Sequence, residues 1–175
     1  LAFLTIVALT GCYYRSENRT EFGKFVLIER LKTNQMDWEG GNTSGDGNSL
    51  CSLVEPNFCI HSERPMVVVH SPRPAMRYLS TIAEDRMWHL NAITGKPLAC
   101  TTCGAIDASI AQEDSSIVVG DWSKDGSVRT ILMRRPDGLL DVVVLGYSDE
   151  SVDAKLVRTL DRQHSSQRIS SFSSS

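Results

Sequence analysis

The sequence lacks an excess of basic residues. Its 18 Lys and Arg are outnumbered by 21 Asp and Glu, so the formal net charge is −3 and the pI is about 5.8. A nucleic-acid-binding domain usually carries a basic face that neutralises phosphates. Because the cationic residues here are spread along the chain, the sequence favours neither DNA nor RNA as a partner.

The chain also has no apolar segment of about 20 residues, the length that a helix needs to cross a bilayer. Its N-terminal run, Leu1–Leu9, is interrupted only by Thr5. This length fits the apolar core of a secretory signal peptide, roughly 7–15 residues. No Met and no basic segment precede Leu1, so we expect the N-terminus to be incomplete. The run therefore predicts export and not a membrane-spanning helix.

Internal repeats and enzyme motifs are absent too. The histidines stand alone in the sequence, so we name no catalytic residue, no metal site and no cofactor; they are His61, His70, His89 and His164. The phrase from Trp88 to Lys96 is similar to one blade of a quinoprotein-type β-propeller. A propeller needs several blades, and a single phrase without a repeat predicts no function.

The apolar run ends in Leu9-Thr10-Gly11-Cys12, which resembles the lipobox of bacterial lipoproteins. The resemblance implies that residues 1–11 are a signal peptide, that Cys12 becomes the lipidated N-terminus, and that residues 12–23 form a tether. Tyr13 stands where an Asp favours retention at the inner membrane, so the resemblance implies an outer-membrane anchor facing the periplasm. Several acyl chains make such anchoring stable.

The four other cysteines are Cys51, Cys59, Cys100 and Cys103. An even number in an exported protein predicts two disulfides. Of the three possible pairings we favour cross-links between the Cys51/Cys59 loop and the Cys100/Cys103 turn, because closing a longer loop removes more entropy from the unfolded chain. Two alternatives stay open. The spacing of Cys100 and Cys103 is that of a thiol redox motif, and the two pairs could supply a four-sulfur zinc site.

The strongest structural pattern lies in the C-terminal half. Three β-branched, apolar segments (117–119, 128–133 and 139–145) are separated by turn sequences ending in Gly126 and Gly138. They predict a three-stranded antiparallel meander. Ser148 as an N-cap, followed by apolar residues at helical spacing, predicts a C-terminal helix over this sheet; the spaced residues are Val152, Leu156, Val157 and Leu160.

The N-terminal half carries weaker patterns. They predict strands at 24–32, 66–69 and 87–92, a short helix at 75–85, a mobile Gly-rich loop at 40–50 and a disordered Ser-rich tail at 165–175. The fold class expected is α+β, with a single domain over residues 24–164. Its N-terminal half is expected to be rich in loops and held by disulfides.

Together these features predict a lipid-anchored envelope protein that binds another protein, as an accessory subunit or as an inhibitor of a periplasmic effector, and that is not an enzyme. One alternative is an anchored thiol–disulfide oxidoreductase that uses Cys100 and Cys103. Another is a binder of small molecules or cell wall through exposed Trp38, Trp88 or Trp122.

Overall fold

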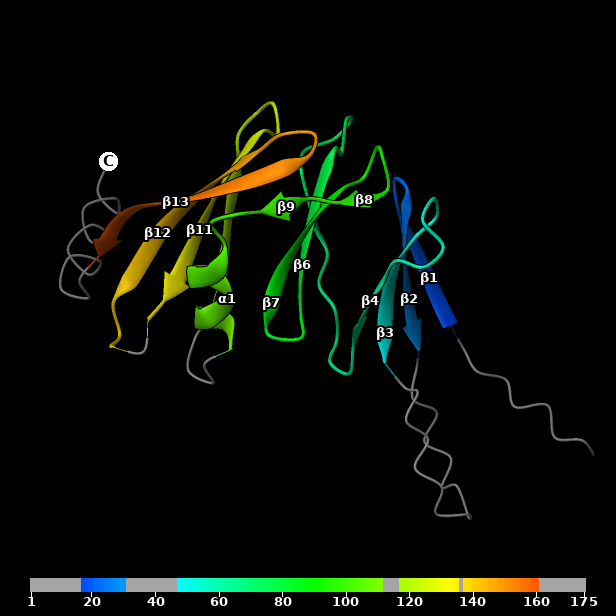
Figure 1. Cartoon of the computed structure of the whole chain (residues 1–175), viewed down its shortest axis with the longest axis horizontal. Helices are drawn as coiled ribbons and strands as arrows, with labels where there is room; N and C mark the ends of the chain where they lie inside the picture. The colour runs from blue at the N-terminus through cyan, green and yellow to red at the C-terminus, as the bar shows by residue number, and fades with distance from the viewer. Residues whose placement is uncertain (1–16, 31–46, 112–116, 136, 161–175) are drawn as a thin grey trace, which may run out of the picture.

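The computed structural model describes residues 17–30, 47–111, 117–135 and 137–160, and over these residues the protein is mainly β. The strands form three sheets that follow one another along the chain (Figure 1). The first sheet contains β1 (Glu17–Phe22), β2 (Phe25–Arg30), β3 (Asn48–Ser52) and β4 (Cys59–Ser62). The middle sheet contains β5 (Val69–His70), β6 (Tyr78–Ala83), β7 (Arg86–Asn91) and β8 (Lys96–Pro97). The third contains β10 (Ile117–Trp122), β11 (Val128–Arg134), β12 (Leu140–Tyr147) and β13 (Ser151–Leu160).

Two short elements link the middle sheet to the third. β9 (Ala99–Cys100) runs parallel to the start of β13 and adds a fifth strand to the third sheet. The helix α1 (Gly104–Ile110) follows β9 and buries Ile106. All other strand pairs are antiparallel, and apart from β9, which lies at the far edge from β10, strands that follow one another within a sheet are neighbours.

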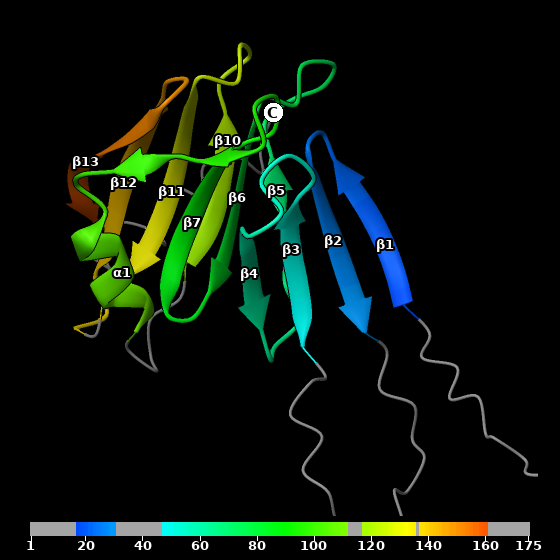
Figure 2. The same cartoon turned by 45° about the vertical axis from the view of Figure 1, so that its right-hand side comes forward.

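The middle sheet is buried on both faces. Successive side chains of a strand point to opposite faces. Tyr78 and Met87 pack into a core shared with the third sheet and α1, whereas Leu79 and Leu90 pack into a second core shared with the first sheet. The three sheets therefore stack side by side with β6 and β7 in between (Figure 2).

The meander predicted in the C-terminal half is confirmed, and the helix predicted after it is wrong. Residues 151–160 form β13, which pairs along the full length of β12. Ser148 caps no helix; it closes the β12–β13 turn by accepting a hydrogen bond from the backbone N–H of Ser151. Leu156 and Val157 are more than half exposed, so the apolar spacing did not mark a buried helical face. The label α+β is accordingly too helical for this chain.

The helix predicted at 75–85 is wrong as well. Most of this segment is β6, which ends in a two-residue turn to β7 at Glu84 and Asp85. Both turn residues have positive φ, 52° and 59°, as a type I′ turn requires. Because neither is Gly, the pair lacks the Asn-Gly or Asp-Gly signal that usually marks such a turn in a sequence.

The strands predicted near 24–32 and 87–92 are confirmed as β2 and β7, whereas only β5 forms in the 66–69 region. The predicted tether is corrected at its end, because β1 lies within residues 12–23 and pairs with β2. The end of the predicted 40–50 loop is wrong, because residues 48–50 begin β3 and pair with β4. The signal peptide, Cys12, Trp38, residues 40–46 and the 165–175 tail lie outside the described residues. None of the described helices is long and apolar enough to cross a membrane.

Candidate functional site

The cysteines pair within each couple, as Cys51–Cys59 and Cys100–Cys103. The cross-linked pairing favoured from the sequence is therefore wrong, and in this oxidised structure none of the four sulfurs is a free thiolate that could bind zinc. Cys51 and Cys59 lie directly opposite each other on the antiparallel strands β3 and β4, with their Cα atoms 4.1 Å apart. Strand register, and not the entropy of loop closure, decides this pair.

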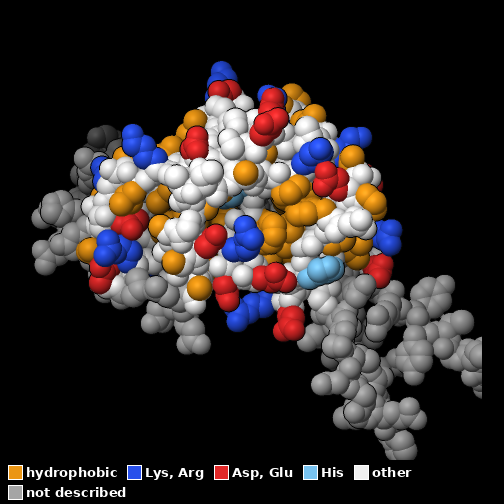
Figure 3. All heavy atoms as spheres, in the orientation of Figure 1, with side chains coloured by type: hydrophobic (Ala, Val, Ile, Leu, Met, Phe, Trp, Pro, Cys, Tyr) orange, Lys and Arg blue, Asp and Glu red, His pale blue; other side chains and the backbone are white. Residues whose placement is uncertain are grey.

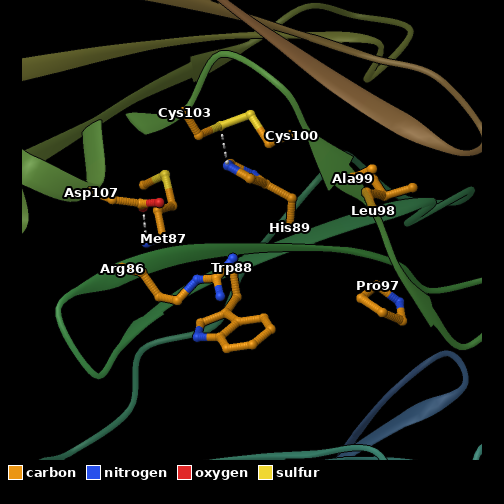
Figure 4. A pocket seen from close by; sticks show the side chains of 10 residues that line it. All are labelled: Arg86, Met87, Trp88, His89, Pro97, Leu98, Ala99, Cys100, Cys103 and Asp107. Atoms are coloured by element: carbon orange, nitrogen blue, oxygen red, sulfur yellow. Dashed lines mark hydrogen bonds between the residues drawn. A yellow bond between two sulfur atoms is a disulfide. The ribbon is translucent and has the colours of Figure 1, made fainter. Parts of the chain in front are cut away.

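The second pair lies at a pocket of about 300 Å³ between the middle and third sheets (Figure 4). Cys100 is the last residue of β9 and Cys103 directly precedes α1, so the two cysteines lie on either side of the turn that joins this strand to the helix. Cys100 is half-buried, whereas Cys103 is only 4 % exposed. The intervening loop is fixed to β13 because the hydroxyl of Thr102 accepts a hydrogen bond from the backbone N–H of Ala154 at 2.8 Å.

His89 stands beneath the disulfide. Its Nε2 atom lies 3.7 Å from the Sγ atom of Cys103, and its Nδ1 atom lies 3.1 Å from the hydroxyl of Tyr147 (Figure 4 shows the first contact). His89 as a whole is only 2 % exposed. Burial, together with the positive charges of Arg129 and Arg86, lowers the pKa of His89 to about 4. The imidazole is therefore neutral at pH 7.

A buried cation lies behind this histidine. Arg129 is fully buried, and its Nη1 donates a hydrogen bond to the hydroxyl of Ser80. Its guanidinium also lies 5.4 Å from the centre of the Trp122 ring and hydrogen-bonds with Tyr147. Among the described residues no hydrogen-bond partner reaches its Nε and Nη2 atoms. Burial raises the pKa of Tyr147 to about 12, so the phenol stays protonated and the positive charge is not cancelled there.

The tryptophans that the structure describes offer no open aromatic platform. Trp122 is partly buried against the core between the middle and third sheets, with its ring centre 4.9 Å from that of Tyr147. Trp88 is half-buried, and the Arg86 guanidinium covers its ring at 4.1 Å. Charges of both signs are interspersed on the face of the molecule in Figure 3.

Sequence reasoning found Cys100 and Cys103 but missed the residues behind them, namely His89, Tyr147, Arg129 and Ser80. A signal for His89 did exist, since the alternation of β7 places it on the same face as Met87. Its partner Tyr147 lies 58 residues away on another sheet, which no local pattern connects.

Comparison with known proteins gives no family. No family model matches the chain, and no curated protein matches it either. Among solved structures, the WD40 domain of SCAP from fission yeast is similar with a TM-score of 0.40 and 14 % sequence identity. The match covers 83 % of this chain and 33 % of that one, so the chain spans about a third of the length of the matched structure.

Proposed function

We propose that this chain is an exported protein whose Cys100–Cys103 disulfide exchanges with the dithiol of a partner protein. The observation that carries the proposal is the position of this pair: a half-buried Cys100 at a pocket, and a buried Cys103 whose Sγ atom is 3.7 Å from His89. Cys51–Cys59, in contrast, joins two directly paired strands of the first sheet. The sequence-based alternative of a redox pair thus receives specific support.

The exchange follows from the difference in exposure. A thiolate of the partner attacks the Sγ atom of Cys100, forms a mixed disulfide and releases Cys103 as a thiolate. A neutral His89 can donate its Nε2–H to this leaving sulfur, and the buried charge of Arg129 favours the anion. The second thiol of the partner then displaces Cys100. The partner leaves as a disulfide, and its two protons end on Cys100 and Cys103.

Redox titration tests this function against an internal control. We expect Cys100–Cys103 to open at a potential above about −300 mV, while Cys51–Cys59 stays closed there, as structural disulfides do. The populations are read by alkylation and peptide mass spectrometry across a series of dithiothreitol buffers. The Cys51→Ser/Cys59→Ser variant should retain the titration of the other pair, whereas simultaneous opening of both disulfides in the wild type would count against a redox site.

We further propose that Cys12 carries a lipid anchor at the outer membrane and that the exchange takes place in the periplasm. The support is the apolar segment ending in Leu9-Thr10-Gly11-Cys12, together with two cysteine pairs suited to an oxidising compartment. Binding of an envelope protein without redox chemistry stays a prediction.

Mass spectrometry of the precursor expressed in a Gram-negative host tests the anchor. We expect an acylated N-terminal peptide that begins at Cys12 and a protein that partitions into detergent. The Cys12→Ser variant should remain uncleaved and unacylated, since the lipid is attached through the cysteine sulfur. An unmodified Cys12 in the wild type would remove the basis for the anchor.

A further inference from the structure

We infer that the reduced form of this site binds a zinc ion through His89, Cys100 and Cys103. The three ligand atoms, one nitrogen and two sulfurs, all lie within 4.8 Å of one another. The inference rests on the proposed function only in that the disulfide must open. It adds a second state to the site, in which metal binding competes with reoxidation.

The distances fit the ion. Zinc binds sulfur at about 2.3 Å and imidazole nitrogen at about 2.0–2.1 Å, so two such ligands of a tetrahedral ion are about 3.5 Å apart. The Nε2 atom of His89 and the Sγ atom of Cys103 are already 3.7 Å apart. Two thiolates on one zinc are about 3.8 Å apart. Because the Cα atoms of Cys100 and Cys103 are 5.5 Å apart, rotation about their Cα–Cβ bonds can separate the sulfurs this far once their bond is broken.

The spacing and the charges also fit. Two residues between the cysteines is the spacing of many zinc sites. Opening the disulfide with a thiol reductant gives two thiols; zinc then binds both sulfurs and releases two protons. Two thiolates cancel the charge of the ion, so no net charge is added beside the buried Arg129. Neutral imidazole is the form that binds metal.

A second contact orients the histidine. A histidine that binds metal through one ring nitrogen usually donates the N–H of its other ring nitrogen to a fixed acceptor. Here the Nδ1 atom of His89 is 3.1 Å from the Tyr147 hydroxyl, which Arg129 and Ser80 hold in turn. In the zinc-bound state the ring proton moves from Nε2 to Nδ1, where it donates to the Tyr147 hydroxyl and leaves the Nε2 lone pair to face the ion. Three protein ligands leave the fourth position of the ion open to the pocket, as in zinc sites that bind water or substrate.

Metal titration of the full chain tests the inference. The protein is reduced with a phosphine, and Co²⁺ and Zn²⁺ are added separately; Co²⁺ reports sulfur ligands through thiolate-to-cobalt charge-transfer bands. We expect the reduced wild type to bind one more equivalent of Zn²⁺ than the Cys100→Ser/Cys103→Ser variant, and the oxidised wild type to match that variant. Both reduced proteins lack the cross-link and retain Cys12, so the comparison isolates the two sulfurs.

Two further variants separate ligation from general stability. His89→Gln removes a ligand but keeps both thiols, and we expect it to weaken Zn²⁺ binding more than Tyr147→Phe does. Tyr147→Phe removes only the orienting hydroxyl and should weaken binding by about 10–100-fold. Equal affinity of His89→Gln and wild type, or equal stoichiometry of wild type and the double serine variant, would overturn the site.

Alkylation of the same samples distinguishes this inference from the proposed function. If reduction makes Cys100 and Cys103 accessible to alkylation but no additional zinc binds, the metal site is overturned. The proposed thiol–disulfide exchange would still hold in that case. A Cys100–Cys103 pair that resists the phosphine would count against both.

Discussion

Replacement of Gly120 by alanine is expected to lower the free energy of unfolding by more than about 3 kcal/mol. Gly120 lies in β10 where the register with β11 shifts between Val119 and Trp122. A Cβ atom at this position would stand 2.0 Å from the backbone oxygen of Thr130 on β11. That oxygen cannot swing aside like a side chain, because Thr130 is also paired with Val144 on β12. The strands must therefore separate to admit the methyl group.

The damage should extend to the candidate site, because Trp122 follows this irregularity and its ring contacts both Tyr147 and Arg129. Urea denaturation followed by tryptophan fluorescence measures the loss. The matched control is Gly104→Ala at the start of α1, where an added Cβ meets no heavy atom within 4 Å. Alanine there should leave stability unchanged or raise it by up to about 1 kcal/mol. Similar midpoints for the two variants would refute the steric argument.

The sequence predicted those parts of the fold whose signals are local. Turn sequences around Gly126 and Gly138 separate β10, β11 and β12, and both glycines have the positive φ that such turns use. β7 is likewise visible in the alternation of residues 87–92. In contrast, β1 is missed because its residues are almost all polar and exposed, so pairing with β2 holds it without an apolar face.

The candidate site could be predicted only in part. The spacing of Cys100 and Cys103 marks a possible redox or metal pair, but the reactivity that we propose depends on what surrounds it. Arg129 illustrates the limit: the alternation of β11 places it on the buried face with Ile131 and Met133, but nothing local shows what would accept its charge there. Its place is set by Ser80 and Tyr147 on two other strands, and such contacts arise only when the middle and third sheets pack together.

The same buried environment predicts a strong pH dependence of stability in the oxidised protein. The groups that act on the ring are Arg86, Arg129 and Tyr147, with Asp107 at the wall of the same pocket. The pKa of His89 falls from 6.5 to about 4 in the folded chain, because burial and the two arginines disfavour the charged imidazole. Between these pH values the unfolded chain binds more protons than the folded one. The stabilisation that depends on a neutral His89 is therefore fully present above about pH 6.5 and is lost as the pH falls toward 4.

We expect the loss across this window to be about 3 kcal/mol, since each pKa unit corresponds to about 1.4 kcal/mol. His89→Gln keeps a polar side chain but cannot be protonated. Between pH 7 and pH 4 its unfolding free energy should therefore fall by about 3 kcal/mol less than that of the wild type. Urea denaturation of both proteins near pH 7 and near pH 4 gives the difference directly. Asp125, whose pKa hydrogen bonds from Ser123 and Ser127 lower from 3.8 to about 2, begins to contribute near pH 4, but both proteins contain it and its effect cancels in the comparison. A difference between variant and wild type that stays constant from pH 7 to pH 4 would show that His89 is not held neutral by its surroundings.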